Sequence, residues 1–105
     1  MGFKGAMVNG FQQTGQEDNV LYLDEPELRP FWGTVSELDV PFYLHPRMQL
    51  SSRAPIYDGH PWLKSSPWGF AVETSIHSLR MCGSGMFDDY PNPVSYTHLT
   101  LPTKA

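Results

Sequence analysis

Three polar side chains that follow short apolar segments carry the chemistry this sequence could perform. Asn9 follows the apolar residues 6–8, and His45 and Arg47 follow the apolar residues 42–44. A neutral imidazole can bind a divalent cation, an amide can hydrogen-bond to a phenolate or carboxylate oxygen, and a guanidinium can hold a carboxylate through two hydrogen bonds. Because α/β proteins place their chemistry at the carboxyl ends of parallel strands, these residues define a candidate site.

Each of the three side chains also has a simpler interpretation. A lone histidine lacks the cluster of ligands by which a metal site is recognised in a sequence. Asn9 can be a turn residue ahead of Gly10, and Arg47 can form a structural ion pair at the edge of the sheet. The residues alone leave both interpretations open.

Two strands separated by one helix are expected to position these side chains. Residues 6–8 and 40–44 are apolar runs typical of buried strands, and Pro46 ends the second run. The apolar spacing in residues 30–38 predicts a helix, preceded by one tight turn at 25–29. The separation of Asn9 and His45 fits one βαβ unit of ~30 or more residues, so the two should stand side by side at the rim of a parallel sheet.

The segments around this unit are less regular. Residues 12–19 are polar and predict a loop, and residues 20–23 a short extended segment. Residues 46–66 contain several prolines, show no periodic pattern and predict a loop. Its aromatic stretch at 56–63 is expected to pack over the strand ends or on another subunit. Ser66 and Pro67 are expected to begin the last helix.

An apolar stripe with 3–4 spacing follows along that last helix. It consists of Trp68, Ala71, Val72, Leu79, Cys82 and Met86. Cys82 is expected to pack as a small hydrophobe. The other polar residues receive structural interpretations: loop packing for His60, a helix or subunit contact for His77, and a solvated or interface pair for Glu73 and Arg80.

Composition excludes several classes of protein. The formal net charge is −4 and no basic run is present, which disfavours nucleic acid and anionic membranes as partners. No apolar stretch approaches the ~20 residues of a transmembrane helix, and no signal peptide is recognisable. Cys82 is the only cysteine, which excludes a disulfide framework. We therefore expect a cytoplasmic protein.

The end of the chain departs from what precedes it. Residues 94–103 show no helical period and match, in order, the translation of a transposon-end sequencing adaptor. We expect a native domain at residues 1–92 and a non-native tail at 93–105, which removes His98 from the candidate ligands. A genuine polar tail is the alternative.

Several segments of this sequence resemble one family. They are Gly-Phe-Lys-Gly-Ala-Met-Val-Asn-Gly-Phe at 2–11, Arg-Pro-Phe-Trp-Gly at 29–33, Pro-Phe-Tyr-Leu-His-Pro-Arg at 41–47 and Tyr-Asp-Gly-His-Pro-Trp-Leu at 57–63. They are similar to the 2,3-dihydroxybenzoate and γ-resorcylate decarboxylases of the amidohydrolase-related group. The resemblance runs from Gly2 to Asn92. It implies an α/β fold in which the chain forms about two β/α units from the middle of a (β/α)₈ TIM barrel of the metal-dependent hydrolase superfamily.

The resemblance also implies a function for the parent protein. His45 matches a metal-binding histidine, and the match at Asn9 suggests substrate contact. Arg47 remains a second candidate for substrate binding because of its guanidinium. The parent would be a carboxy-lyase that removes CO₂ from an ortho-hydroxybenzoate such as 2,3-dihydroxybenzoate, using a divalent zinc or manganese ion and no organic cofactor, as a homo-oligomer.

The remaining functional groups are expected outside this chain. The family's Glu-x-His or Glu-x-Ala motif would lie upstream, and its Gly-His-x-Gly-Glu motif, an Asp ligand and the proton donor downstream. No catalytic residue is therefore assigned here, and the chain alone is expected to be inactive. The alternatives are an inert truncated gene product and a metal-dependent hydrolase of the same superfamily.

Overall fold

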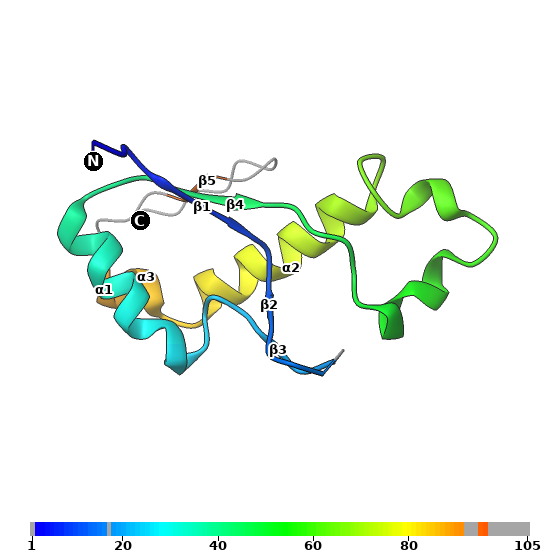
Figure 1. Cartoon of the computed structure of the whole chain (residues 1–105), viewed down its shortest axis with the longest axis horizontal. Coiled ribbons are helices and arrows are strands. Elements are labelled where there is room, and N and C mark those ends of the chain that lie inside the picture. Colours follow the sequence, from blue (N-terminus) through cyan, green and yellow to red (C-terminus); the bar gives the residue numbers. More distant parts are fainter. Residues whose placement is uncertain (1, 17, 92–94, 97–105) are drawn as a thin grey trace.

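A small parallel sheet with helices on one face forms the centre of the computed structural model (Figure 1). The structure describes residues 2–16 and 18–91, and the backbone of 95–96. The sheet has the order β1 (Ala6–Asn9), β4 (Phe42–His45), β5 (Ser95–Tyr96), and both pairings are parallel. The predicted βαβ unit is therefore confirmed.

The third strand lies within the segment assigned to a sequencing adaptor. Of residues 93–105, only the backbone of β5 is described, where it pairs with β4 from Phe42 to Tyr43. The boundary at residue 92, the turn expected there and the exclusion of His98 fall on residues that are otherwise outside the described part of the chain. They stay predictions.

A hairpin stands at the carboxyl end of β1, where the sequence predicted a loop. β2 (Gln12–Gln13) and β3 (Val20–Leu21) pair in antiparallel orientation. The hairpin is closed by the backbone N–H and hydroxyl of Thr14, which donate to the carbonyl of Asn19 at 2.8 and 2.9 Å. The extended segment predicted after the loop is confirmed, but the loop begins with a strand.

The helix between the two main strands forms as predicted, after one 3₁₀ turn. The turn η1 spans Pro26–Leu28 and α1 spans Arg29–Leu38. Pro30 is tolerated because the first helical turn leaves its N–H groups without intrahelical partners. Leu38, expected on the buried face, is 64% exposed at the last position of the helix. Asp39 follows as the C-cap in the left-handed region, with φ 50°.

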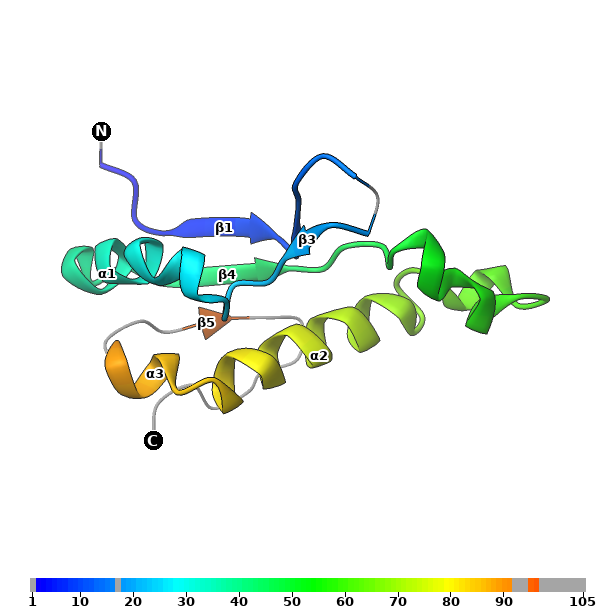
Figure 2. The same cartoon turned by 90° about the horizontal axis from the view of Figure 1, so that it is seen from below.

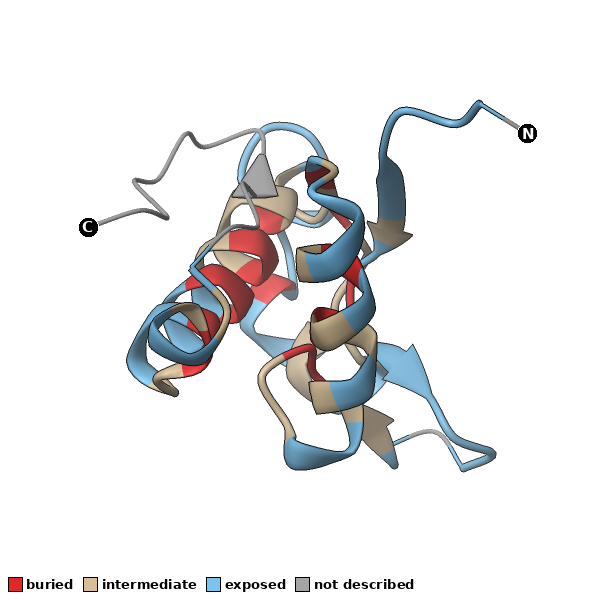
Figure 3. Ribbon diagram, turned by 90° about the vertical axis from the view of Figure 1, so that its left-hand side faces the viewer, coloured by how far each residue is buried: buried red, intermediate tan, exposed pale blue. Residues whose placement is uncertain are grey.

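The core lies between the sheet and the helices, as the burial colours in Figure 3 show. Phe42 and Leu44 point from β4 towards the helices and are almost fully buried, and the Trp32 ring meets Phe42 edge-on at 5.0 Å. Side chains alternate between the two faces of a strand, so Met7, Asn9, Tyr43 and His45 share the opposite face. Figure 2 views the sheet from the side on which the helices lie, and no helix of the described residues covers the opposite face. Met7 on that face is 68% exposed.

The last long helix is oriented differently from the prediction. α2 spans Gly69–Gly83, without a side-chain cap from Ser66. Its first residue must be glycine, because a Cβ at position 69 would lie 1.9 Å from the carbonyl oxygen of Lys64. The short helix α3 (Met86–Asp89) follows, and Met86 is buried.

The buried face of α2 is mostly polar. Its buried residues are Gly69, Glu73, Thr74, His77, Ser78 and Met81. By contrast, Leu79 of the predicted apolar stripe is 62% exposed and Cys82 is exposed, so Cys82 does not pack as a core residue. Glu73 and His77 can be buried because partners from distant segments satisfy their polar atoms.

The segment between β4 and α2 contains more regular structure than predicted. Two 3₁₀ helices, η2 (Ser51–Tyr57) and η3 (Pro61–Leu63), interrupt what the sequence predicted to be a loop. Tyr57 is buried, whereas Ile56 and Trp62 are 82% and 63% exposed.

Within the described residues, no helix is long and apolar enough to cross a membrane.

Candidate functional site

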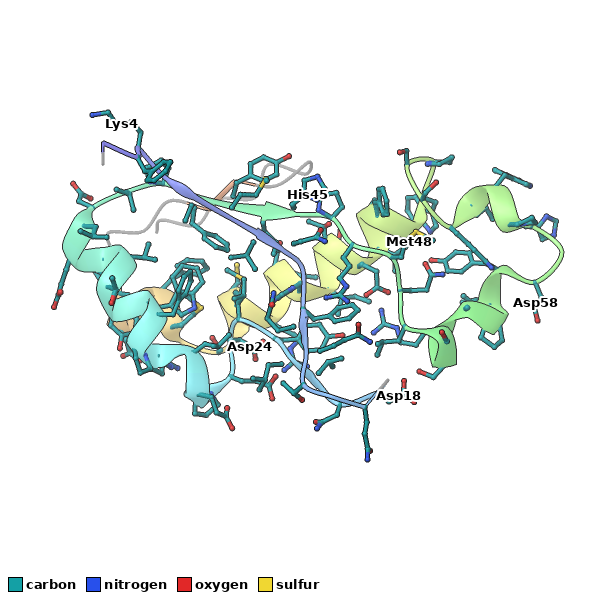
Figure 4. The ribbon with its side chains drawn as sticks, in the orientation of Figure 1. Lys4, Asp18, Asp24, His45, Met48 and Asp58 are labelled. Atoms are coloured by element: carbon teal, nitrogen blue, oxygen red, sulfur yellow. The ribbon has the colours of Figure 1, made fainter. Side chains whose placement is uncertain are left out.

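Asn9 and His45 meet at the carboxyl ends of β1 and β4. They are direct partners in the parallel register, and Oδ1 of Asn9 lies 3.0 Å from Nδ1 of His45. Figure 4 shows His45 on the side of the sheet away from α2. The predicted juxtaposition is therefore confirmed, on the face of the sheet that the helices leave open.

The surroundings of His45 fix which ring nitrogen carries the proton. Nδ1 lies 2.8 Å from the carbonyl oxygen of Pro46, which can only accept a hydrogen bond. Nδ1 is therefore the donor, shared between Pro46 and Asn9, and the lone pair resides on Nε2. This is the form in which histidine binds a metal ion, with its other nitrogen oriented by a carbonyl or amide oxygen.

Gly10 allows Arg47 to approach the end of β1. Gly10 has φ +67°, in the region that favours glycine, and a Cβ at this position would lie 2.8 Å from Cβ of Arg47. Any larger residue would push the two strand ends apart. Gly10 is thus required by both backbone conformation and packing.

Arg47 is bound to the hairpin rather than placed beside His45. Its Nη1 donates to the carbonyl of Phe11 at 2.5 Å and its Nη2 to Oε1 of Gln13 at 2.6 Å. The guanidinium also lies 4.5 Å from the centre of the Phe11 ring. Neutral contacts therefore replace the ion pair that the sequence left open for Arg47. Its role in substrate binding stays a prediction.

The backbone of Leu23 is held from two sides. Its N–H donates to Nε2 of His77 at 2.8 Å, and its carbonyl accepts from Nε1 of Trp32 at 2.7 Å. His77 is 2% exposed, and desolvation by burial lowers its pKa to about 4, because the charged form loses its hydration. A neutral His77 therefore accepts a hydrogen bond from the Leu23 backbone. This corrects the expectation that His77 contacts another helix or another subunit.

Arg80 holds the residues on either side of Leu23. Its Nε and Nη2 donate to the Asp24 carboxylate at 2.8 and 3.2 Å, and its guanidinium lies 4.1 Å from the centre of the Tyr22 ring. The hydrogen bond to Asp24 raises the pKa of Arg80. α2 therefore fixes residues 22–24, which follow the hairpin at the strand ends.

Glu73 forms an ion pair with Arg53 and not with Arg80. Glu73 is 6% exposed, and the pair joins α2 to η2, the first regular segment after His45 and Arg47. The prediction of a Glu73–Arg80 pair is wrong because each side chain bonds to a different loop.

His60 was expected to pack within its aromatic loop. It lies exposed between η2 and η3, and its ring centre is 6.3 Å from that of Trp62.

An open cavity of about 590 Å³ lies along the edge of β1. Its lining includes Met7 and Asn9 from one face of the strand and Val8 from the other, together with Leu23 and Arg47. A cavity that touches both faces of an edge strand is the space that a neighbouring strand would occupy. Asn9 therefore lies at the open edge of the sheet, and its partner His45 lies on the next strand inwards.

The described residues contain one candidate metal ligand, His45, and no complete metal site. Among them, no group of three or more His, Cys, Asp or Glu side chains could hold an ion. His45 has the tautomer and orientation of a ligand, so the residue fits such a role, and the other donors would have to come from elsewhere in the protein.

The hydrogen bonds that hold the Leu23 backbone were not predicted from the sequence. Apolar spacing identifies the stripe on α2 but does not reveal which side faces the sheet. The recurrence of Glu73, Thr74, His77 and Ser78 at helical spacing is the one signal that could have indicated a buried polar face.

Comparison with known proteins identifies the family. The sequence matches the amidohydrolase family over residues 1–105. The γ-resorcylate decarboxylase of Rhizobium sp. (strain MTP-10005) is 57% identical over 91 residues, which cover 87% of this chain and 28% of the relative. This chain therefore belongs to the amidohydrolase family and spans about three tenths of the length of that relative.

Two solved structures of relatives have the same fold over this region. A 2,6-dihydroxybenzoate decarboxylase from Rhizobium superposes with a TM-score of 0.88 at 54% identity, covering 91% of this chain and 30% of that one. A dihydroxybenzoic acid decarboxylase from Polaromonas sp. JS666, with bound manganese and the inhibitor 2-nitroresorcinol, gives 0.87 at 53% identity, covering 91% and 29%. The predicted fold class is confirmed: over about three tenths of their length, these amidohydrolase-family relatives have the fold of this chain.

Proposed function

We propose that this chain is part of a metal-dependent, non-oxidative decarboxylase of ortho-hydroxybenzoates. The first candidate substrate is 2,6-dihydroxybenzoate, because relatives more than half identical to this chain carry that activity in their names. The sequence analysis put 2,3-dihydroxybenzoate first, and it becomes the second candidate. The product would be CO₂ and the corresponding phenol.

The observation that carries the proposal is the pairing of Asn9 with His45 at the ends of two parallel strands. Its place at the carboxyl end of the sheet is where TIM-barrel enzymes hold their active sites. His45 would bind the metal through Nε2. Asn9 would orient the His45 ring through Oδ1 and offer its amide N–H groups to an oxygen of the substrate.

A divalent ion, when bound, supplies Lewis acidity that polarises the substrate's carboxylate and neighbouring hydroxyl oxygen. Manganese is the first candidate, because the Polaromonas relative was crystallised with it, and zinc is the second. We propose no organic cofactor. Arg47 would contact the substrate carboxylate. For this contact, part of the Arg47 guanidinium must face the site while the rest keeps its hydrogen bonds to the hairpin.

The chain alone would not catalyse the reaction. His45 is one ligand, and the proton donor for the ring carbon would come from another part of the barrel. We expect the whole protein to be a cytoplasmic homo-oligomer. The single cysteine of this chain favours a reducing compartment, and exposed apolar side chains such as Trp68 and Leu79 favour association.

Two experiments test the proposal. Sequencing the gene on both sides should recover a Glu-x-His or Glu-x-Ala motif upstream and a Gly-His-x-Gly-Glu motif downstream. Clean reads with stop codons at both ends would contradict it and favour an inert gene product.

The activity itself can be tested in a chimera, in which residues 2–91 replace the matching segment of the γ-resorcylate decarboxylase from Rhizobium sp. (strain MTP-10005). This Rhizobium chimera should release CO₂ from 2,6-dihydroxybenzoate in the presence of Mn²⁺. A folded, metal-loaded chimera that hydrolyses a lactone or amide but releases no CO₂ would instead favour a hydrolase.

A further inference from the structure

A small cavity lies between the buried face of α2 and the ends of β1 and β4. Glu73, Thr74 and His77 line it from the helix, and the opposite wall is formed by Leu44 and His45 of β4 and by residues that follow the two strands. About 10 Å³ of the cavity is accessible to a water molecule. A single water needs on the order of 10–15 Å³ of such space, so the cavity reaches the size of one water and is far too small for an organic ligand.

The hydroxyl of Thr74 has no partner inside the described part of the chain. Thr74 is 3% exposed, and its Oγ1 is buried without a hydrogen bond. A threonine in a helix can bond to the carbonyl of the preceding turn, but Thr74 does not make this bond. Native proteins pair almost all buried polar groups with protein or with ordered water, so this hydroxyl points to a bound molecule in the cavity.

The ring of His77 presents a donor to the same cavity. The backbone N–H of Leu23 donates to Nε2, so Nε2 carries no proton. Burial keeps the ring neutral, because desolvation lowers the pKa of His77 to about 4. The one ring proton is therefore on Nδ1, which makes no hydrogen bond within residues 2–16 and 18–91.

Glu73 adds an acceptor beside these two groups. Its Oε1 forms the ion pair with Arg53, and a carboxylate has about four lone-pair sites, so Glu73 can accept further hydrogen bonds. A molecule in the cavity thus has three polar neighbours on consecutive turns of one helix. Buried waters typically make about three hydrogen bonds, which is the number that these neighbours offer.

Other occupants fit this set of groups less well. A cation would meet the protonated Nδ1 of His77, and no cluster of three or more His, Cys, Asp or Glu side chains in the described residues could hold one. An apolar side chain from another part of the protein would fill the space but would leave the Thr74 hydroxyl and the His77 proton unpaired.

We propose that this cavity holds one internal water molecule, which accepts a hydrogen bond from Nδ1 of His77 and donates to Oγ1 of Thr74 and to the carboxylate of Glu73. The water completes the hydrogen bonding of the polar face that α2 buries against the strand ends. This inference concerns the packing of α2 and does not depend on the reaction.

A crystal structure of the Rhizobium chimera tests the proposal directly, because all residues that line the cavity lie within residues 2–91. We expect an ordered water within about 3.2 Å of both Oγ1 of Thr74 and Nδ1 of His77. A dry cavity, or one filled by a side chain from the remainder of the barrel, would overturn the proposal.

Two buried hydroxyls on α2 provide a matched pair of variants. Ser78 is also buried with an unpartnered Oγ, but it does not line the cavity. Thr74→Val keeps the shape of the side chain and removes its hydrogen bond to the water, so it should lower the folded-to-unfolded ratio of the chimera about 5- to 30-fold in urea unfolding. Ser78→Ala should leave this ratio unchanged or raise it, since it removes a hydroxyl without a partner.

Thr74→Ser keeps the hydroxyl and should retain the water in a crystal structure, whereas Thr74→Val should lose it or hold it with lower occupancy. The proposal fails if Thr74→Val is at least as stable as the unmodified chimera, because the Thr74 hydroxyl would then have no partner to lose. It also fails if the water density is the same in the Thr74→Val and Thr74→Ser chimeras.

Discussion

Nδ1 of His45 lies 3.0 Å from Oδ1 of Asn9 across the ends of two adjacent parallel strands. The same nitrogen contacts the Pro46 carbonyl at 2.8 Å, so two oxygens orient one imidazole ring. This arrangement is what a metal-binding histidine needs from its neighbours, and it relates the fold directly to the proposed chemistry.

The first prediction concerns the support that Asn9 gives to His45. In the Rhizobium chimera, Asn9→Ala should lower Mn²⁺ affinity about 10- to 100-fold, because the ring loses an oxygen that orients it. Asn9→Asp keeps an acceptor at that position and should retain more of the affinity. Titration with Mn²⁺ measures both. Equal affinities for Asn9→Ala and the unmodified chimera would show that Asn9 is only a turn residue.

The second prediction concerns pH and His77. Its pKa is about 4 in the folded protein and about 6.5 unfolded, so the unfolded state binds the proton more tightly. Neutral His77 makes its full contribution to the free energy of unfolding above pH 6.5. This contribution is lost as the pH falls towards 4, and the loss amounts to up to roughly 3 kcal/mol.

The variant His77→Gln isolates this effect, since glutamine can still accept from Leu23 but does not titrate. Urea unfolding of the chimera between pH 7 and pH 4 should show a smaller loss of stability in His77→Gln than in the unmodified chimera. Parallel pH curves for the two proteins would show that protonation of His77 does not weaken the Leu23 contact.

The third prediction separates two roles for Arg47. Arg47→Lys cannot reproduce the two hydrogen bonds to Phe11 and Gln13. The free energy of opening the hairpin should therefore fall by about 1–2 kcal/mol, and proteases should cleave the hairpin faster. If Arg47 also contacts substrate, the same variant should raise KM. Gln13→Ala is the matched control and should loosen the hairpin alone. Identical KM values for the two variants would contradict a substrate contact.

The fourth prediction concerns the chain on its own. The open sheet face and the unpaired edge of β1 expose surface that a complete barrel would cover. We therefore expect residues 1–92 to aggregate or to lack a sharp thermal transition in calorimetry. A single cooperative transition at low protein concentration would show that two β/α units are sufficient for a stable fold.

The sheet could be predicted from the sequence because its signals are local. Two apolar runs, each ending in a polar residue and separated by one helix, leave few alternatives to a parallel βαβ unit. The register that pairs Asn9 with His45 follows from that arrangement. The resemblance to decarboxylases then supplied the chemistry that a lone histidine could not.

The orientation of α2 could not be predicted in the same way. Apolar spacing predicted a stripe from Trp68 to Met86, but Trp68 and Leu79 on it are exposed and only Met86, in α3, is fully buried. The face that packs on the sheet is stabilised by contacts with residues far away in the chain, such as Arg53 with Glu73 and Leu23 with His77. No local pattern encodes these partners. The same holds for Arg47, whose hydrogen-bond acceptors lie in the hairpin after β1.

The most direct test of the account is the effect of His45→Ala on metal content and CO₂ release from 2,6-dihydroxybenzoate in the Rhizobium chimera. Removing a metal ligand should lower the Mn²⁺ affinity more than removing Asn9, which orients that ligand. We therefore predict that Mn²⁺ affinity and the rate of CO₂ release both fall by at least about 100-fold. His60→Ala, in the exposed loop, should leave both unchanged. A His45→Ala chimera that binds Mn²⁺ and releases CO₂ as well as the unmodified chimera would contradict the assignment of His45 as a metal ligand.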